Sequence, residues 1–152
     1  MPTPNTEYVA RLKKLVQQAP YPRHMNMELA EIDMDTSVVE LTLGECHMKP
    51  FGIVHGGVLA TMIDTATFWA AFLRLPDGDG LVNMDLKLNY LKAVEKGVLR
   101  AEGKCLRYGR SVSYAESSVV DEADELVAHG TSTLMAQPGK GLQQGRDKFL
   151  SE

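Results

Sequence analysis

The feature that most limits the fold is one long stretch with helical spacing that is apolar or small on every side. It covers residues 56–74 and reads GGVLATMIDTATFWAAFLR. A surface helix has one polar face, so a helix without one is expected to be enclosed by protein. On a period of 3.6 residues, the side suited to the concave face of a sheet carries Leu59, Ile63, Ala66, Ala70 and Leu73.

The remaining segments predict one short helix and a set of antiparallel strands. Residues 7–18 have helical spacing, ended by Pro20 and Pro22, and residues 27–43 indicate two strands around a turn near Asp35. Residues 45–54 are expected to be largely loop. Period-two alternation then predicts strands at 81–91, 97–108, 111–121 and 125–135, with breaks short enough for hairpins. The expected class is α+β, with a single long helix against one antiparallel sheet.

Length and composition limit the class of protein. The 152 residues fit one domain, predicted at 1–137, and the polar, Gly-rich residues 138–152 predict a flexible tail. The net charge of −4 and the lack of a long basic run argue against a nucleic-acid partner. Lys104, Arg107 and Arg110, with Lys92 upstream, are enough cations for one phosphorylated ligand.

Cysteine usage and the apolar stretches indicate a cytoplasmic protein. Cys46 and Cys105 form neither a disulfide framework nor a cluster with histidine, so no metal or other cofactor is expected. The N-terminus lacks the pattern of a signal peptide. The longest apolar stretch, 57–73, is short for a membrane span of about 20 residues and carries Asp64. No membrane partner is therefore predicted.

Asp64 is the only charged residue inside the apolar helix. Burying a carboxylate without a partner costs several kcal/mol, so the group should be paired, hydrated or raised in pKa. Its helix face consists mostly of small residues, which would let a second helix or a ligand approach closely: Gly57, Ala60, Thr61, Thr67, Phe68 and Ala71. A structural carboxylate bonded to backbone or to Thr61 at a subunit contact is an equal alternative.

The tripeptide His55-Gly56-Gly57 stands directly before this helix. The first N–H groups of a helix have no internal partner, and two glycines let a ligand approach them, which suits an oxyanion site. A plain loop-to-helix junction is the alternative for the glycines alone. His55 and Asp64 are roughly 13 Å apart along one helix axis. They could meet if two such helices packed antiparallel across a two-fold axis, which would build each site from two chains.

The run His55-Gly-Gly-Val-Leu-Ala-Thr-Met-Ile-Asp64 resembles the HGG-x6-D signature of PaaI-like hotdog thioesterases, in the 4-hydroxybenzoyl-CoA thioesterase superfamily. Residues 82–92, Gly109-Arg110 and residues 127–135 are similar to the later strands and hairpin of that family, so the resemblance covers about 24–136. It implies a curved sheet around the long helix, homodimers or homotetramers, and hydrolysis of an acyl-CoA thioester.

The same resemblance implies roles for the signature residues. The N–H of Gly57, or of Gly56, would polarise the thioester carbonyl. Asp64 of the partner chain would act as general base or as nucleophile, a choice that the sequence leaves open. His55 would orient the thioester or a water molecule in its neutral form.

Two positions depart from the family pattern, and four more are candidate ligand contacts. Lys49 stands where many relatives have Asn, and Asn83 where some have Ser or Thr. Both are candidates for placing water or binding substrate. Phe68 is expected to line the acyl pocket. The cations that could contact CoA phosphates, or alternatively only solvent, are Lys92, Arg107 and Arg110.

Two other functions fit the same scaffold. A non-catalytic acyl-CoA-binding protein is the main alternative, because Lys49 and Asn83 could mark lost chemistry. A hydratase acting on enoyl-CoA is disfavoured, because its Asp precedes its His, whereas here His55 precedes Asp64. The sequence does not specify the acyl group.

Overall fold

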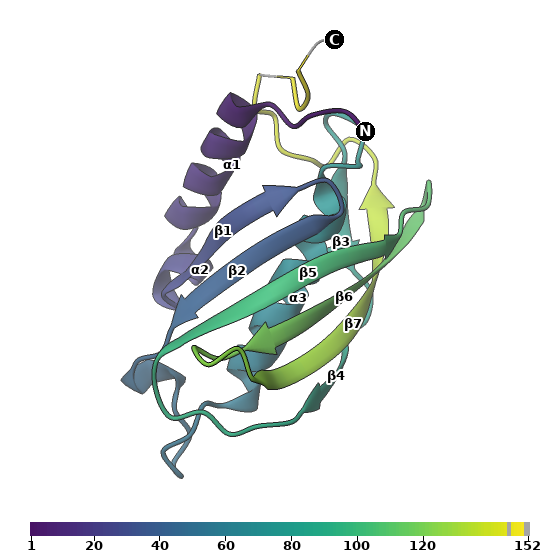
Figure 1. Ribbon diagram of the computed structural model, residues 1–152. Coiled ribbons are helices and arrows are strands. Elements are labelled where there is room, and N and C mark those ends of the chain that lie inside the picture. Colours follow the sequence, from purple (N-terminus) through teal and green to yellow (C-terminus); the bar gives the residue numbers. More distant parts are fainter. Residues whose placement is uncertain (146, 151–152) are drawn as a thin grey trace.

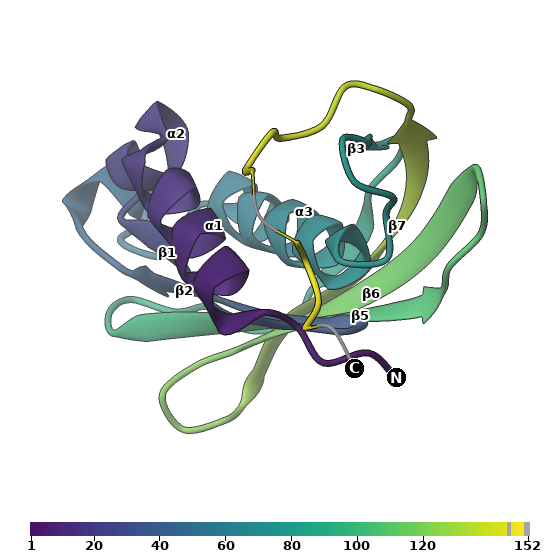
Figure 2. The ribbon, with the colours of Figure 1, turned by 90° about the horizontal axis from the view of Figure 1, so that it is seen from above.

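The long apolar helix is enclosed as predicted. In the computed structural model, which describes residues 1–145 and 147–150, α3 (Gly56–Phe72) lies along the concave side of a curved antiparallel sheet (Figures 1 and 2). The side chains expected to face the sheet are at most 3% exposed: Leu59, Ile63, Ala66, Ala70 and Leu73. These positions confirm the predicted α+β layout.

Seven strands form the sheet within the described residues. They are β1 (Met27–Asp33), β2 (Thr36–Thr42), β3 (Gly80–Asn83), β4 (Lys87–Tyr90), β5 (Val98–Arg107), β6 (Val112–Val120) and β7 (Leu126–Gln137). Their order is β1-β2-β5-β6-β7-β3, and β4 also pairs with β7. The β2–β5 pairing runs from Thr36↔Lys104 to Thr42↔Val98 and joins segments on either side of α3 in the chain. This long-range pairing connects the β1–β2 hairpin to the strands that follow the helix.

The helix approaches β5 so closely that one strand position has no room for a side chain. A Cβ at Gly103 would stand 2.3 Å from the backbone oxygen of Ala66. Ser37 Oγ on β2 donates to the same oxygen at 2.7 Å. This contact fixes the depth of α3 in the sheet, and Asp64 lies two residues before it.

The continuous strand expected at 81–91 is wrong: the segment forms β3 and β4 with a bend between them. Asp85 lies in the bend, where its Oδ1 accepts from the backbone N–H of Thr133 at 2.7 Å. Its backbone oxygen accepts from Ser132 Oγ at 2.8 Å. Because side-chain groups replace the regular ladder here, the strand is interrupted while both halves remain paired with β7.

Two helices precede the sheet. The helix predicted at 7–18 is α1 (Thr6–Gln18), which buries Tyr8, Leu12 and Val16. It ends before Pro20 as expected, but Pro20 then begins a short unpredicted helix, α2 (Pro20–His24), because proline fits a first helical turn. A 3-10 turn, η1 (Glu45–His47), lies in the expected loop. Within the described ranges, no helix has both the length and the apolar character to cross a membrane.

The segment after β7 returns to the N-terminal side of the fold (Figure 2). Part of the predicted tail, Arg146 and residues 151–152, lies outside the described residues. Lys148 is 5% exposed, and its Nζ donates to the backbone oxygen of Leu75 at 2.7 Å, just beyond α3. Phe149 pairs with Pro4 in an isolated bridge. The domain boundary at residue 137 and the flexibility of the tail stay predictions.

Candidate active site

His55 caps the N-terminus of α3 with its own ring. Its backbone is extended, and Nδ1 accepts a hydrogen bond from the N–H of Gly57 at 2.8 Å. A ring nitrogen that accepts carries no proton, so the neutral imidazole has its proton on Nε2. His55 is therefore a donor through Nε2, while Nδ1 satisfies one of the open amides of the first helical turn.

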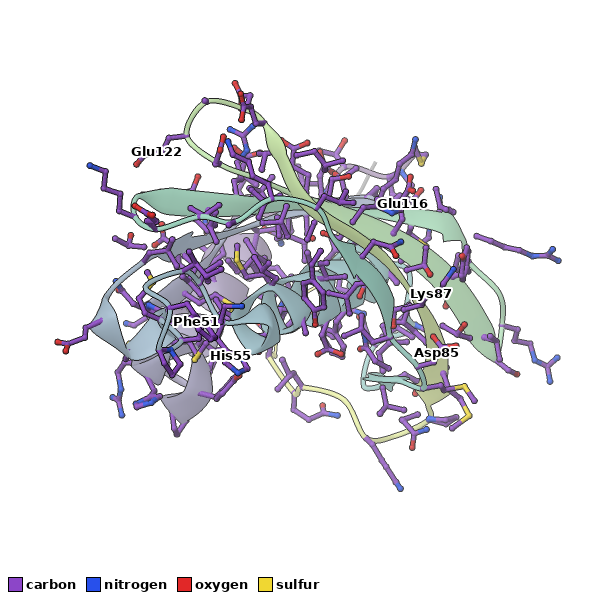
Figure 3. All side chains as sticks on the ribbon, turned by 90° about the horizontal axis from the view of Figure 1, so that it is seen from below. Phe51, His55, Asp85, Lys87, Glu116 and Glu122 are labelled. Carbon is purple, nitrogen blue, oxygen red and sulfur yellow. The ribbon has the colours of Figure 1, made fainter. Side chains whose placement is uncertain are left out.

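A pocket of about 510 Å³ opens at this helix end. Its polar lining comes from the helix start and from two lysines, and its other walls are mostly apolar. The lining residues are Lys49, Ile53, Val54, His55, Gly56, Gly57, Leu59, Tyr90, Leu91, Lys92 and Ala93. Figure 3 shows His55 at this end of α3, with Phe51 nearby. The structure thus brings the predicted His55, Gly56 and Gly57 to one ligand-sized opening.

The two glycine amides differ in availability. The N–H of Gly57 already donates to His55, whereas the N–H of Gly56 donates no hydrogen bond within the described chain. A carbonyl oxygen can therefore bind at Gly56 directly, but it binds at Gly57 only if the His55 ring turns away. A Cβ at Gly56 would stand 3.0 Å from the Tyr90 ring, so the absence of a side chain lets the tyrosine pack against Gly56.

Asp64 has the environment of a reactive carboxylate. Its side chain is partly buried, and burial raises the pKa of Asp64 above its ordinary value of 3.8. No hydrogen bond or ion pair to its carboxylate occurs among the described residues. Thr61, the partner expected in the structural alternative, is bonded instead to the hydroxyl of Tyr21 at 2.8 Å. The Asp64 carboxylate is thus available for chemistry or for a partner outside this chain.

The pocket and Asp64 are separate within one chain. Asp64 does not line the pocket at His55, in agreement with the roughly 13 Å that nine helical residues span. A complete site with both groups therefore needs a second chain or a large rearrangement. That a second chain supplies Asp64 stays a prediction.

Asn83 holds the backbone of α3 next to Asp64. Its Nδ2 lies 2.9 Å from Ser132 Oγ, 3.2 Å from the backbone oxygen of Asp64 and 3.3 Å from Thr67 Oγ1. Ser132 in turn donates to the backbone oxygen of Asp85. The amide nitrogen is engaged in this network, so the structure favours a positioning role for Asn83 over binding water through that nitrogen.

The two lysines of the pocket have different surroundings. Lys92 Nζ pairs with Asp121 at 2.5 Å and also with Glu125, and the hydrogen bond to Asp121 is the main cause that raises the pKa of Lys92. Lys49 has no carboxylate partner among the described residues, and its Nζ lies 5.7 Å from the centre of the Phe51 ring. The positive charge of Lys92 is thus already compensated by two carboxylates, and the charge of Lys49 is not.

The other predicted ligand contacts lie away from this pocket. Arg107 ends β5 and Arg110 lies in the β5–β6 turn, both exposed. Lys92 instead pairs with the other end of β6, so the nine residues of β6, roughly 25–30 Å, separate it from these arginines (Figure 1). Lys92 and the two arginines therefore do not form one cationic group around a phosphate within this chain.

Phe68, expected to line the acyl pocket, also lies outside the lining. It packs on Trp69 and Phe72, with 4.8 and 5.9 Å between ring centres.

Two structural participants were not predicted from the sequence. Tyr90 packs against Gly56, but a tyrosine at the end of an alternating strand gives no local signal of a site. Lys148 donates to carbonyls beyond the C-terminal end of α3, with its Nζ 5.1 Å from the centre of the Phe72 ring. Its sequence context is that of a loose polar tail.

Comparisons with known proteins agree on one family. The family model described as the thioesterase superfamily matches residues 51–128. A 1,4-dihydroxy-2-naphthoyl-CoA hydrolase of Listeria monocytogenes is 23% identical over 110 residues, covering 72% of this chain and 89% of the relative. A proofreading thioesterase of Cronobacter turicensis is 26% identical over 99 residues, covering 65% and 72%.

A solved structure extends the agreement to nearly the whole chain. The crystal structure of a thioesterase from Haemophilus influenzae superposes with a TM-score of 0.82 at 23% identity. The superposition covers 96% of this chain and 100% of the other. This likeness confirms the hotdog fold that the sequence resemblance implied.

Proposed function

Because the chain belongs to the thioesterase superfamily, and so hydrolyses thioesters, we propose that its substrate is an acyl-CoA held at the start of α3 and hydrolysed with the help of Asp64. The observation that carries this proposal is the pocket that brings a free helix N-terminal amide and the His55 ring together. The relative from Listeria monocytogenes, which acts by its name on a CoA thioester, supports the substrate class.

In this proposal the thioester carbonyl binds where the helix dipole and the amides favour negative charge. The N–H of Gly56 is open to the carbonyl oxygen from the start. The N–H of Gly57 joins it if the substrate displaces His55 Nδ1, and Nε2–H of His55 donates to the thioester or to a water molecule. These donors stabilise the oxyanion that forms when the carbonyl carbon is attacked.

The proposed base or nucleophile is Asp64 of a second chain. Two α3 helices packed antiparallel through their small-residue faces would put each Asp64 near the other chain's Gly56 and Gly57. The Asp64 carboxylate has no partner among residues 1–145 and 147–150, which supports this arrangement, since a partner outside the chain would complete its surroundings. We therefore propose a homodimer with two shared sites, which could pair further into a homotetramer.

The chemistry balances in either form. As a base, Asp64 takes a proton from water while the water oxygen bonds to the carbonyl carbon. The tetrahedral intermediate then expels the CoA thiolate, which takes up the proton and leaves the free acid. As a nucleophile, Asp64 displaces the thiolate to form a mixed anhydride that water then hydrolyses. Neither form needs a cofactor.

Cys46 and Cys105 are free thiols, as expected in a reducing compartment, so we place the reaction in the cytoplasm.

Thiol release from a panel of acyl-CoA esters tests this function. Replacing Asp64 by Asn keeps the shape of the side chain but removes the base. We expect a loss of at least about a hundredfold in kcat, since general bases contribute roughly 10²–10⁴. Glu28→Gln, at an exposed position of β1, is the matched control and should retain activity. Binding of CoA esters without any turnover by the wild type would instead identify a non-catalytic acyl-CoA-binding protein.

A further inference from the structure

Lys49 is held in place at the edge of the pocket. Its backbone N–H donates to the oxygen of Ile53, and its own oxygen accepts from the N–H of Gly52, both at 2.9 Å. Met48 and Val54 pair in a bridge directly outside this turn. The base of the Lys49 side chain is therefore fixed relative to His55, which follows Val54 in the chain.

The charge of Lys49 is not compensated by the protein. The side chain is partly buried, yet no carboxylate pairs with it in the described residues, and the Phe51 ring at 5.7 Å offers only a weak attraction. Lys92 in the same pocket provides an internal comparison, because Asp121 and Glu125 both pair with it. Within the part of the chain that the structure describes, Lys49 is thus the ammonium group of this pocket that lacks an anion.

The rest of the lining does not supply that anion. No acidic side chain is among the lining residues of the described chain, and the lining includes the apolar Ile53, Leu59 and Leu91. A partly desolvated cation in such surroundings gains most from a ligand that brings the opposite charge. The pocket also contains the amide of Gly56, so this ligand would be bound next to the reacting carbonyl.

We propose that Lys49 binds a negatively charged group of the substrate and so makes the enzyme selective for anionic thioesters. This inference rests on the proposed thioesterase function. A carboxylate on the acyl group and a phosphate of CoA share the required chemistry. The pocket of about 510 Å³ favours the acyl carboxylate, because the CoA phosphates stand at the far end of the pantetheine arm from the thioester.

Four thioesters separate the two sources of charge. Succinyl-CoA and butyryl-CoA differ by an acyl carboxylate, and succinyl-pantetheine and butyryl-pantetheine repeat that difference without phosphates. Each is assayed by thiol release with the wild type, with Lys49→Met, which keeps most of the side-chain stem, and with Lys49→Arg, which keeps the charge. Lys14→Gln, at an exposed position of α1 outside the pocket lining, controls for the loss of one positive charge.

We expect Lys49→Met to lower kcat/KM about 10- to 100-fold for both succinyl thioesters, the size of one hydrogen bond to a charged group. Both butyryl thioesters should be unaffected, and Lys49→Arg should restore much of the loss. A loss confined to both CoA esters would support the same anion site with a phosphate as its ligand. An equal loss on all four thioesters would overturn the inference, because Lys49 would then act on the thioester itself. Absence of wild-type turnover on every thioester would instead refute the proposed function.

Discussion

Replacing His55 by two different residues should separate its structural role from its role in the pocket. Nδ1 of His55 caps α3 by accepting from the N–H of Gly57 at 2.8 Å. Alanine removes this acceptor, and the loss of an N-cap costs about 1 kcal/mol. For a chain of 152 residues this corresponds to a decrease in Tm of roughly 2–4 °C. His55 is exposed, so little lost packing adds to this value.

Asparagine at position 55 should keep the cap and lose the chemistry. Its side-chain oxygen is among the best acceptors at an N-cap, so His55→Asn should unfold within a few tenths of a kcal/mol of the wild type. Both variants lack the Nε2–H donor of the ring and should lose similar amounts of thioesterase activity. Urea unfolding at one fixed protein concentration and thiol release measure the two effects separately. If Asn destabilises as much as Ala, or if Ala does not destabilise, the contact with Gly57 is not a stabilising cap.

Two further predictions concern stability. Burial raises the folded-state pKa of Asp64 above its ordinary 3.8, so its charge destabilises the fold at pH values above the folded pKa and has no effect below 3.8. In thermal unfolding, Asp64→Asn should therefore be more stable than the wild type at pH 7, and this advantage should disappear as the pH falls below 3.8. A constant difference at all pH values would contradict the assigned cause. Gly103→Ala should cost about 1–3 kcal/mol in urea unfolding, because its Cβ would stand 2.3 Å from the Ala66 oxygen. Gly44→Ala, whose Cβ would have its nearest neighbour at 3.8 Å, is the control and should cost much less.

Local patterns in the sequence predicted the helices and hairpins well because their causes are local. The apolar helix expected at 56–74 ends slightly earlier, at Phe72, and Arg74 beyond its end pairs with Asp35, Nε to Oδ1, at 2.8 Å. The interruption between β3 and β4 could not be predicted, because it depends on bonds from Asp85 to residues 47 and 48 positions later. The β2–β5 pairing across α3 is likewise a long-range contact with no local signal.

The same distinction applies to the candidate site. The sequence marks residues 55–57 and Asp64 as site candidates because the evidence is local. The tripeptide directly precedes a helix, and Asp64 is a charged residue among apolar helical neighbours. The compensation of Lys92 depends on Asp121 and Glu125, which lie 29 and 33 residues later, so its charge looked free in the sequence. The hydrogen bond from Asn83 to α3 and the packing of Tyr90 against Gly56 also result from sheet geometry.

A mixture of two inactive variants gives the most direct test of the central claim, that each site joins the start of α3 in one chain to Asp64 of another. Asp64→Asn removes the carboxylate, and Gly57→Leu disrupts the start of α3, because its Cβ would stand 2.9 Å from Nδ1 of His55. Chains carrying different tags are exchanged, and the mixed species are purified and assayed by thiol release. A mixed dimer would contain one intact site of its two, so the purified mixed species should show about half of the wild-type activity. Mixed dimers that form but remain inactive would contradict the claim.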